Sequence, residues 1–143
     1  MKKAYLYILL VLVAATSCRD SYDDYVQDRG ETIGFTTPTL EVTLPPGGVI
    51  NGFPLAFFVT SVSSSDRTFQ LRVVDSETTL SADNYSFETT VTVLAGERKG
   101  TLLFNAENNS IAADDFQNVV IEFMPTESIN SGKKALVSLK STQ

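Results

Sequence analysis

Carboxylates are the reactive side chains that this 143-residue chain has in quantity. It contains 17 Asp and Glu residues, no histidine and a single cysteine, Cys18. The absence of histidine excludes a Ser-His-Asp triad and a histidine-ligated metal site. There is also no Gly-rich phosphate loop and no dinucleotide-binding fingerprint. Two carboxylates at the right separation could hydrolyse a glycoside, but the short turns of the chain leave little cleft to hold them. The sequence therefore predicts a protein that is not an enzyme.

The first 17 residues have the order of a secretory signal peptide. Lys2 and Lys3 are followed by an uncharged, mostly apolar run over residues 4–15, and small residues come next. A membrane-spanning helix needs roughly 20 apolar residues, so this run is too short to be one. Residues 1–17 are therefore predicted to be a signal peptide that is removed on export.

Cys18 is the residue that ends this leader. The segment Ala15-Thr16-Ser17-Cys18 resembles the lipobox of bacterial lipoproteins, although Ala15 stands where Leu, Val or Ile is usual. The resemblance implies cleavage between Ser17 and Cys18 and acyl chains on Cys18. The alternative is ordinary cleavage with Cys18 as a bystander. A lone exposed thiol is a liability in an oxidising compartment, which favours lipidation, and several acyl chains anchor a protein stably.

An acidic segment follows the cysteine. Residues 18–31 are polar and aperiodic, which predicts a flexible tether. Asp20, Asp23 and Asp24 resemble the surface-export signal of Bacteroidota lipoproteins; the alternative is a solvated spacer. Loss of the leader removes two lysines and leaves nine basic against 17 acidic side chains, a net charge of −8. This negative charge excludes nucleic-acid binding and electrostatic binding to anionic lipid. The expected location is the outer membrane, by a lipid anchor, at the cell surface.

The rest of the chain reads as β-strands. Runs rich in β-branched and aromatic residues alternate with Gly, Pro, Asn, Asp and Ser clusters, and no amphipathic helix stands out. The predicted strands are 32–36, 40–44, 53–60, 67–75, 86–94, 99–105, 117–124 and 133–140. The nearly all-apolar run 53–60 predicts a strand covered on both faces, with Pro54 at its start. Residues 32–143 are thus predicted to form one monomeric domain, an all-β, antiparallel immunoglobulin-like β-sandwich of seven to eight strands.

Several of these runs resemble the Calx-beta domain family. Two elements carry most of the resemblance: Ser81-Ala-Asp-Asn-Tyr85, with its Asp-Tyr landmark, and the Ala95-Gly-Glu97 turn between two strands. Ile33-Gly-Phe35, the run Leu40-Glu-Val-Thr43 before Gly47-Gly48, and Asp114-Asp115 before a late strand extend it over residues 32–139. The chain is similar as well to short, uncharacterised lipoproteins of the Bacteroidota.

The resemblance to Calx-beta domains raises the question of a calcium site. Some Calx-beta domains bind calcium through acidic residues at one end of the sandwich, because the ion needs several oxygen ligands. Leu44-Pro45-Pro46 replaces an early glutamate of that family. The remaining candidates for a metal site are Asp83, Asp114 and Asp115, with Glu107. The alternative is that Asp83 caps its own turn and that Asp114 and Asp115 are solvated. No cofactor is therefore expected, with calcium as the exception to test.

The sequence leaves three functions open. The first is a non-catalytic binding or adhesion module for a glycan or a protein. The second is a structural accessory subunit that docks onto an outer-membrane assembly by strand addition or by a sandwich face. The third is a calcium-stabilised adhesion domain. The sequence offers no exposed aromatic platform of the kind that sugar sites usually have, because the chain has no Trp and its Phe residues fall mainly on inward positions. The resemblance implies that Tyr85 packs inside the sandwich.

Overall fold

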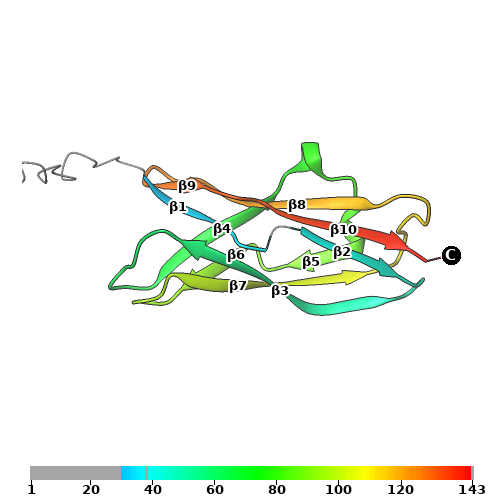
Figure 1. The fold of residues 1–143 in the computed structure, drawn as a ribbon, viewed down its shortest axis with the longest axis horizontal. Coiled ribbons are helices and arrows are strands. Elements are labelled where there is room, and N and C mark those ends of the chain that lie inside the picture. The colour runs from blue at the N-terminus through cyan, green and yellow to red at the C-terminus, as the bar shows by residue number, and fades with distance from the viewer. Residues whose placement is uncertain (1–29, 38, 143) are drawn as a thin grey trace, which may run out of the picture.

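The computed structural model describes residues 30–37 and 39–142, which form a sandwich of two five-stranded sheets (Figure 1). The leader, Cys18 and the three tether aspartates lie outside the described residues. The strands are β1 (Glu31–Phe35), β2 (Thr39–Leu44), β3 (Val49–Val59), β4 (Arg67–Val73), β5 (Tyr85–Phe87), β6 (Thr90–Val93), β7 (Lys99–Glu107), β8 (Gln117–Phe123), β9 (Ile129–Ser131) and β10 (Ala135–Ser141). Two short 3-10 helices, η2 (Asp75–Glu77) and η3 (Ala82–Asn84), interrupt the chain between β4 and β5.

The strand order confirms the predicted all-β sandwich. One sheet has the order β5-β7-β3-β1-β9 and the other β2-β10-β8-β4-β6. Most neighbours are antiparallel, but β1 pairs with β9 and β2 pairs with β10 in parallel. The sandwich has ten strands, not seven or eight. The predicted strand 86–94 is divided into β5 and β6, and the short, half-polar β9 was not predicted from the sequence.

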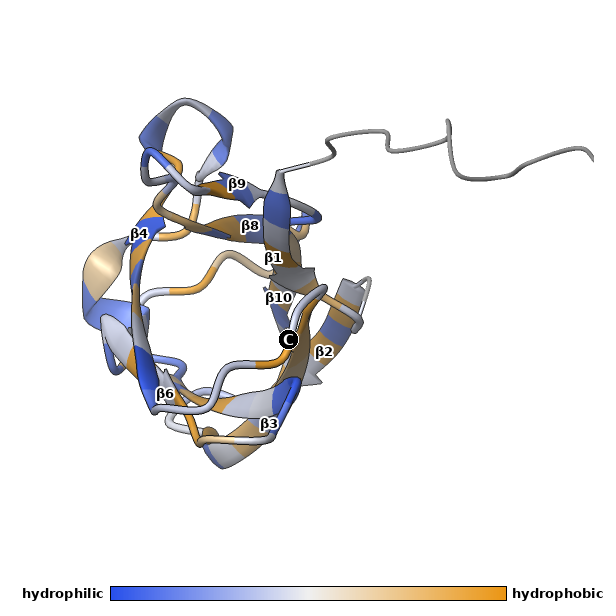
Figure 2. Cartoon of the chain, turned by 90° about the vertical axis from the view of Figure 1, so that its left-hand side faces the viewer, coloured by the Kyte–Doolittle hydropathy of each residue, from blue (hydrophilic) through white to orange (hydrophobic). Residues whose placement is uncertain are grey.

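Two pairs of consecutive strands pass from one sheet to the other. β1 pairs with β3, whereas β2, three residues further on, pairs with β10 in the opposite sheet. In the same way β5 pairs with β7 and β6 with β4. The second crossing occurs at Glu88-Thr89, where the Thr89 carbonyl accepts a hydrogen bond from the Leu71 N–H at 2.8 Å. Strands that switch sheets form the corners of a sandwich, and here they draw the two sheets together (Figure 2).

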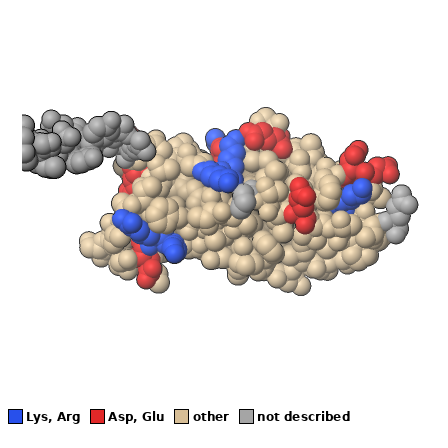
Figure 3. All heavy atoms as spheres, in the orientation of Figure 1, with Lys and Arg blue, Asp and Glu red and all other residues tan. Residues whose placement is uncertain are grey.

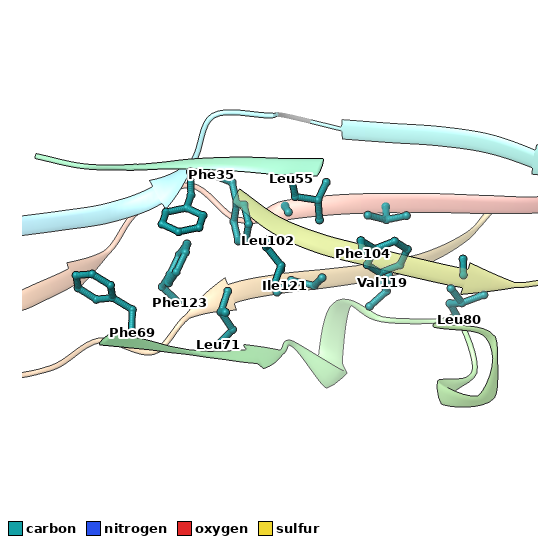
Figure 4. Packing of buried hydrophobic residues seen from close by; sticks show 14 of the residues in the cluster. Phe35, Leu55, Phe69, Leu71, Leu80, Leu102, Phe104, Val119, Ile121 and Phe123 are labelled. Carbon is teal, nitrogen blue, oxygen red and sulfur yellow. The ribbon is translucent and has the colours of Figure 1, made fainter. Parts of the chain in front are cut away.

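The core lies between the sheets and is rich in phenylalanine. Phe123 packs against Phe35, Phe57 and Phe69, with ring centroids 4.9, 5.2 and 6.4 Å apart. These rings and the buried aliphatic side chains interdigitate along the sandwich (Figure 4). On β8, Val119, Ile121 and Phe123 are buried between the sheets, and Val120 is buried as well. Apolar side chains on alternate positions of both sheets thus supply the main stabilisation.

β3 differs from its predicted environment. Leu55, Phe57 and Val59 are buried, but Pro54 is exposed and Phe58 is half-buried. The strand is therefore covered on one face only, and the expectation of burial on both faces is wrong. Pro54 lies in the middle of the strand, not at its start, because β3 begins at Val49. A bulge between Ile50 and Phe53 joins the two halves, and Pro54 follows it in register with Leu103 of β7.

Within the described part of the chain, no helix has the length and apolar character needed to cross a bilayer.

Candidate ligand-binding groove

Two adjoining hollows mark the outer face of β5, β7 and β3. The first, of about 350 Å³, is lined by Asn51, Asp83, Ser86, Asn105 and Glu107 with Val49 among others. The second, of about 270 Å³, shares Ser86 and Asn105 and adds Leu103 and Glu88. Because they share two residues, the hollows form one shallow groove, called here the β5-β7-β3 groove. A third hollow of about 530 Å³ lies further along this sheet, beside Ala56, Phe58 and Thr101.

The pleat of β7 sets the chemistry of the groove. Leu102, Phe104 and Ala106 are buried in the core, so the intervening Leu103 and Asn105 project outward. The register places Ser86 opposite Asn105 and Val49 opposite Glu107. Leu103 and Val49 are 56% and 53% exposed, which gives the groove apolar surface beside its polar groups. The groove therefore offers amide, hydroxyl and carboxylate groups next to aliphatic side chains.

Asn84 fixes the end of the groove next to β5. This residue is fully buried, and its Nδ2 donates to Ser110 Oγ at 3.0 Å and to Asp83 Oδ1 at 3.1 Å. Its Oδ1 accepts hydrogen bonds from the backbone N–H groups of Asn109 and Ser110, both at 3.0 Å. One side chain thus ties η3 to the loop after β7. A buried amide with its donors and acceptors satisfied holds such loops in one conformation.

Asn108 makes a second junction at the same end. It is 6% exposed, and its Nδ2 donates to the carbonyls of Leu44 and Pro45 at 3.0 Å and to Ser141 Oγ at 2.8 Å. Its Oδ1 accepts from the Ile111 N–H at 3.1 Å. Asn108 thereby joins the end of β2, the loop after β7 and the end of β10. The loops of this end are connected by neutral amides.

Asp83 is exposed at the mouth of the groove. A hydrogen bond from the Ser81 side chain is the main reason that its pKa lies below the usual value, and a hydrogen bond with Ser110 lowers it further. Hydrogen bonds to the ionised form favour that form. Asp83 therefore presents a negative charge at neutral pH.

Tyr85 lies at the base of the groove and packs with aromatic neighbours. Its ring is stacked with Phe87 and Phe104 at centroid distances of 6.2 Å. It is half-buried. Burial, and secondarily the negative charge of Asp75, raises the pKa of its phenol. Tyr85 therefore contributes to packing, as the resemblance implied, and does not offer an open stacking platform.

The raised pKa of Tyr85 can be measured directly. The chain has no Trp, and the other four tyrosines precede residue 30, so Tyr85 is the sole phenol absorber in residues 30–143. We expect its tyrosinate band to appear at a higher pH than in a free tyrosine peptide, because burial disfavours the charged phenolate. Asp75→Asn should move the midpoint down slightly. An absorbance titration with a midpoint at or below that of the peptide would contradict this environment.

The four carboxylates put forward for calcium are placed as follows. Asp83 and Glu107 both line the first hollow. Asp114 and Asp115 lie in the loop before β8, and the Asp114 carbonyl accepts a hydrogen bond from Lys140 Nζ at 3.0 Å. Among residues 30–37 and 39–142, no group of three or more Asp, Glu, Cys or His side chains is arranged to hold a metal ion.

We expect calcium to leave thermal stability unchanged. Two carboxylates and neutral amides give a weak site, because affinity follows the number of charged ligands. With a Kd near 10 mM, about 1 mM calcium stabilises the fold by under roughly 0.1 kcal/mol. Melting curves in calcium and in chelator should therefore coincide. A rise of several degrees in calcium would show that carboxylates converge on an ion.

Asn51, Ser86 and Asn105 build the groove but carry no distinctive sequence signal, because polar residues on a half-exposed strand are typical of solvent-facing positions. The one available signal was Asn51-Gly52, a turn-type pair inside an otherwise apolar run. It marks the bulge, where Gly52 has a φ of 65° and its N–H donates to Asn105 Oδ1 at 2.8 Å.

Comparisons with known proteins show similarity in fold. No protein-family model matches the chain, and no curated protein does. Among solved structures, it is similar to a "putative carbohydrate binding protein" from Bacteroides ovatus, with a TM-score of 0.62 and 13% identity over 78% of this chain and 37% of that one. The chain spans less than half the length of this and three other similar structures from that species.

The chain is also similar to solved structures of Calx domains. The apo form of the Calx CBD1 domain superposes with a TM-score of 0.57 and 11% identity, over 80% of this chain and 99% of that one. The calcium binding domain CBD12 of CALX1.1 gives a TM-score of 0.57 and 10% identity, over 76% of this chain and 44% of that one. Identities this low establish the fold alone. The chain therefore has a Calx-beta-like, immunoglobulin-like β-sandwich fold.

Proposed function

We propose that this protein is a non-catalytic, lipid-anchored binding module of the cell surface that takes a glycan in the β5-β7-β3 groove. The observation that carries the proposal is the groove itself, in which Asn51, Asn105 and Ser86 present amide and hydroxyl groups beside the carboxylate of Glu107. Such groups donate to and accept from sugar hydroxyls. Val49 and Leu103, both more than half exposed, supply apolar surface for the C–H faces of a sugar ring.

Two features set the strength of binding that we expect. The groove is shallow and open, so it would cover a chain of sugars from one side only. It also lacks an outward-facing aromatic ring among the residues that line the two hollows, because Tyr85 and Phe87 stack with Phe104. Both features favour weak binding, which repetition of the protein over a cell surface would strengthen by multivalency.

A glycan array with the exported form of the protein tests the proposal. Asn51→Ala combined with Glu107→Gln should weaken binding about tenfold or more, since each hydrogen bond contributes about 1 kcal/mol and 1.4 kcal/mol is a factor of ten. The matched control is Thr68→Ala with Gln70→Ala, two exposed positions on the outer face of the other sheet. Equal loss in both double variants, or no glycan bound by the unaltered protein, would refute the groove assignment.

An accessory subunit is the second candidate function. Among the strands of residues 30–37 and 39–142, β2 is an edge strand of six residues whose one partner is β10. The side of an edge strand that faces away from its partner offers backbone groups to an added strand. Glu41→Lys, at an exposed position of β2, should weaken such an assembly and leave glycan binding unchanged. The opposite outcome would favour the groove.

The anchor is a separate part of the proposal. It is supported by the leader, by Cys18 at its end and by the acidic tether that contains Asp20, Asp23 and Asp24. Labelling of cells with a fatty acid should mark the unaltered protein and miss Cys18→Ala. Surface protease treatment should remove the unaltered protein and spare a variant with Asn at the three aspartates. Equal labelling of Cys18→Ala would refute lipidation.

A further inference from the structure

The bulge in β3 places a reactive pair of residues beside the groove. Asn51 is exposed, and Gly52 follows it. These two residues form the bulge, because the register with β7 shifts between Ile50 and Phe53. Gly52 has a φ of 65°, and a Cβ built on it would meet no atom within 4 Å. The space around Gly52 is therefore open, and the backbone is held in a conformation that glycine adopts readily.

An asparagine followed by glycine can lose its side-chain amide without an enzyme. The backbone nitrogen of Gly52 gives up its proton to solvent base and attacks Cγ of Asn51. A bond forms between that nitrogen and Cγ, the bond from Cγ to the side-chain nitrogen breaks, and ammonia leaves with a proton. The product is a five-membered succinimide. Water then adds to either of its carbonyls and opens the ring to an aspartyl or an isoaspartyl residue, so that no oxidant or reductant is needed.

We propose that Asn51 is a spontaneous deamidation site whose rate is restrained by Asn105. The attacking nitrogen is the donor of the 2.8 Å hydrogen bond from Gly52 to Asn105 Oδ1. This hydrogen bond stabilises the protonated amide and fixes the peptide plane, and both effects oppose ring closure. Asn105 acts on Gly52 and takes no part in the bond changes, so it is a positioning residue.

Conversion would change the charge of the groove. Asn51, Asp83 and Glu107 line the same hollow, so deamidation turns two carboxylates into three. Conversion through the isoaspartyl product also adds a backbone atom to β3 within the bulge. The inference extends beyond glycan binding and does not depend on it, because the reaction requires only this chain and water.

Peptide mapping by mass spectrometry after incubation of the full chain at about pH 8 tests the inference. The peptide that contains Asn51 should gain about 1 Da, because –NH2 is replaced by –OH, and the gain should be faster at higher pH. Asn105→Ala should speed the gain about fivefold, which corresponds to about 1 kcal/mol for one hydrogen bond. Asn105→Asp keeps an acceptor oxygen and should stay close to the unaltered rate.

Two controls keep the test decisive. Asn51→Gln, which would have to close a larger ring, should show no gain. The peptides that carry Asn118 and Asn130 serve as internal references. Circular dichroism of each variant verifies that it is folded. Gain at Asn51 no faster than at the reference asparagines would overturn the site, and equal rates in Asn105→Ala and the unaltered protein would overturn the restraint.

Discussion

Val93→Asp should remove much of the free energy of unfolding of the domain, whereas Thr92→Asp should leave it nearly unchanged. Val93 is 1% exposed between the sheets, and its neighbour Thr92 is exposed on the outer face. An aspartate at position 93 would lose the burial of the valine and place a carboxylate without a partner in the core. We expect a cost of about 4 kcal/mol or more, a large part of the stability of a small domain.

Urea denaturation of residues 30–143 measures both variants. Thr92→Asp introduces the same charge one residue away. It should lower the free energy of unfolding by under about 1 kcal/mol, the range of strand propensity at an exposed position. Each variant adds a negative charge to an already acidic protein, so the comparison cancels the effect of net charge. A reversed order of the two effects would mean that β6 is shifted by one residue against β4.

Asn108→Asp should be the most destabilising near-isosteric change in the loops. The Nδ2 group of Asn108 donates to two carbonyls and a hydroxyl. An oxygen in its place is an acceptor that faces the carbonyl oxygens of Leu44 and Pro45. A buried, unpaired polar or charged group of this kind costs about 3 kcal/mol or more, and the thermal midpoint should fall by many degrees.

The matched control is Asn51→Asp, the same substitution at an exposed position, which should change stability by under about 0.5 kcal/mol. The penalty at position 108 should also shrink as the pH falls toward about 4, because a protonated carboxyl regains one donor. Similar midpoints for the two variants would contradict the junction assigned to Asn108. So would a penalty for Asn108→Asp that does not vary with pH.

The sequence predicted those parts of the fold whose pattern is local. β4 alternates between apolar and polar residues from Thr68 onward, and β7 and β8 are runs rich in apolar and β-branched residues, so these local patterns identified all three strands with nearly correct bounds. β9 has three residues and one apolar side chain, too few to show a period. Thr89 broke the alternation of the predicted strand 86–94, and the structure gives the reason, because the chain changes sheets at that point.

The candidate site was less predictable because its residues act over long sequence separations. Asn108 contacts Leu44 and Ser141, which are 64 and 33 residues away. An asparagine after a strand reads from sequence as a turn residue, and nothing local distinguishes a buried junction from a solvated loop. The resemblance to Calx-beta domains predicted a cluster of carboxylates at the end of the sandwich where the loop after β7 lies. The structure instead shows two buried amides, Asn84 and Asn108, that hold its loops together.

The parallel pairing of β2 with β10 has a mechanical consequence. The described chain begins at one end of the long axis of the sandwich and finishes at the other (Figure 1). β2 and β10 run in the same direction, in register over six residue pairs. A force that pulls residue 30 and residue 142 apart would slide one strand lengthwise past the other.

That geometry loads the hydrogen bonds of the ladder together, in shear, whereas a hairpin pulled from its open end loses them one at a time. Resistance to such a force depends on the barrier to unfolding. The pairing of β1 with β3 and β9 and the β2–β10 ladder would both oppose the pull. Charged side chains are sparse on the face shown in Figure 3, but Glu31 of β1 forms an ion pair with Arg67 of β4. Salt should therefore weaken that ion pair and leave the backbone pairing and apolar packing largely unchanged. We therefore expect the β2–β10 ladder to carry part of any tension applied along the length of the domain.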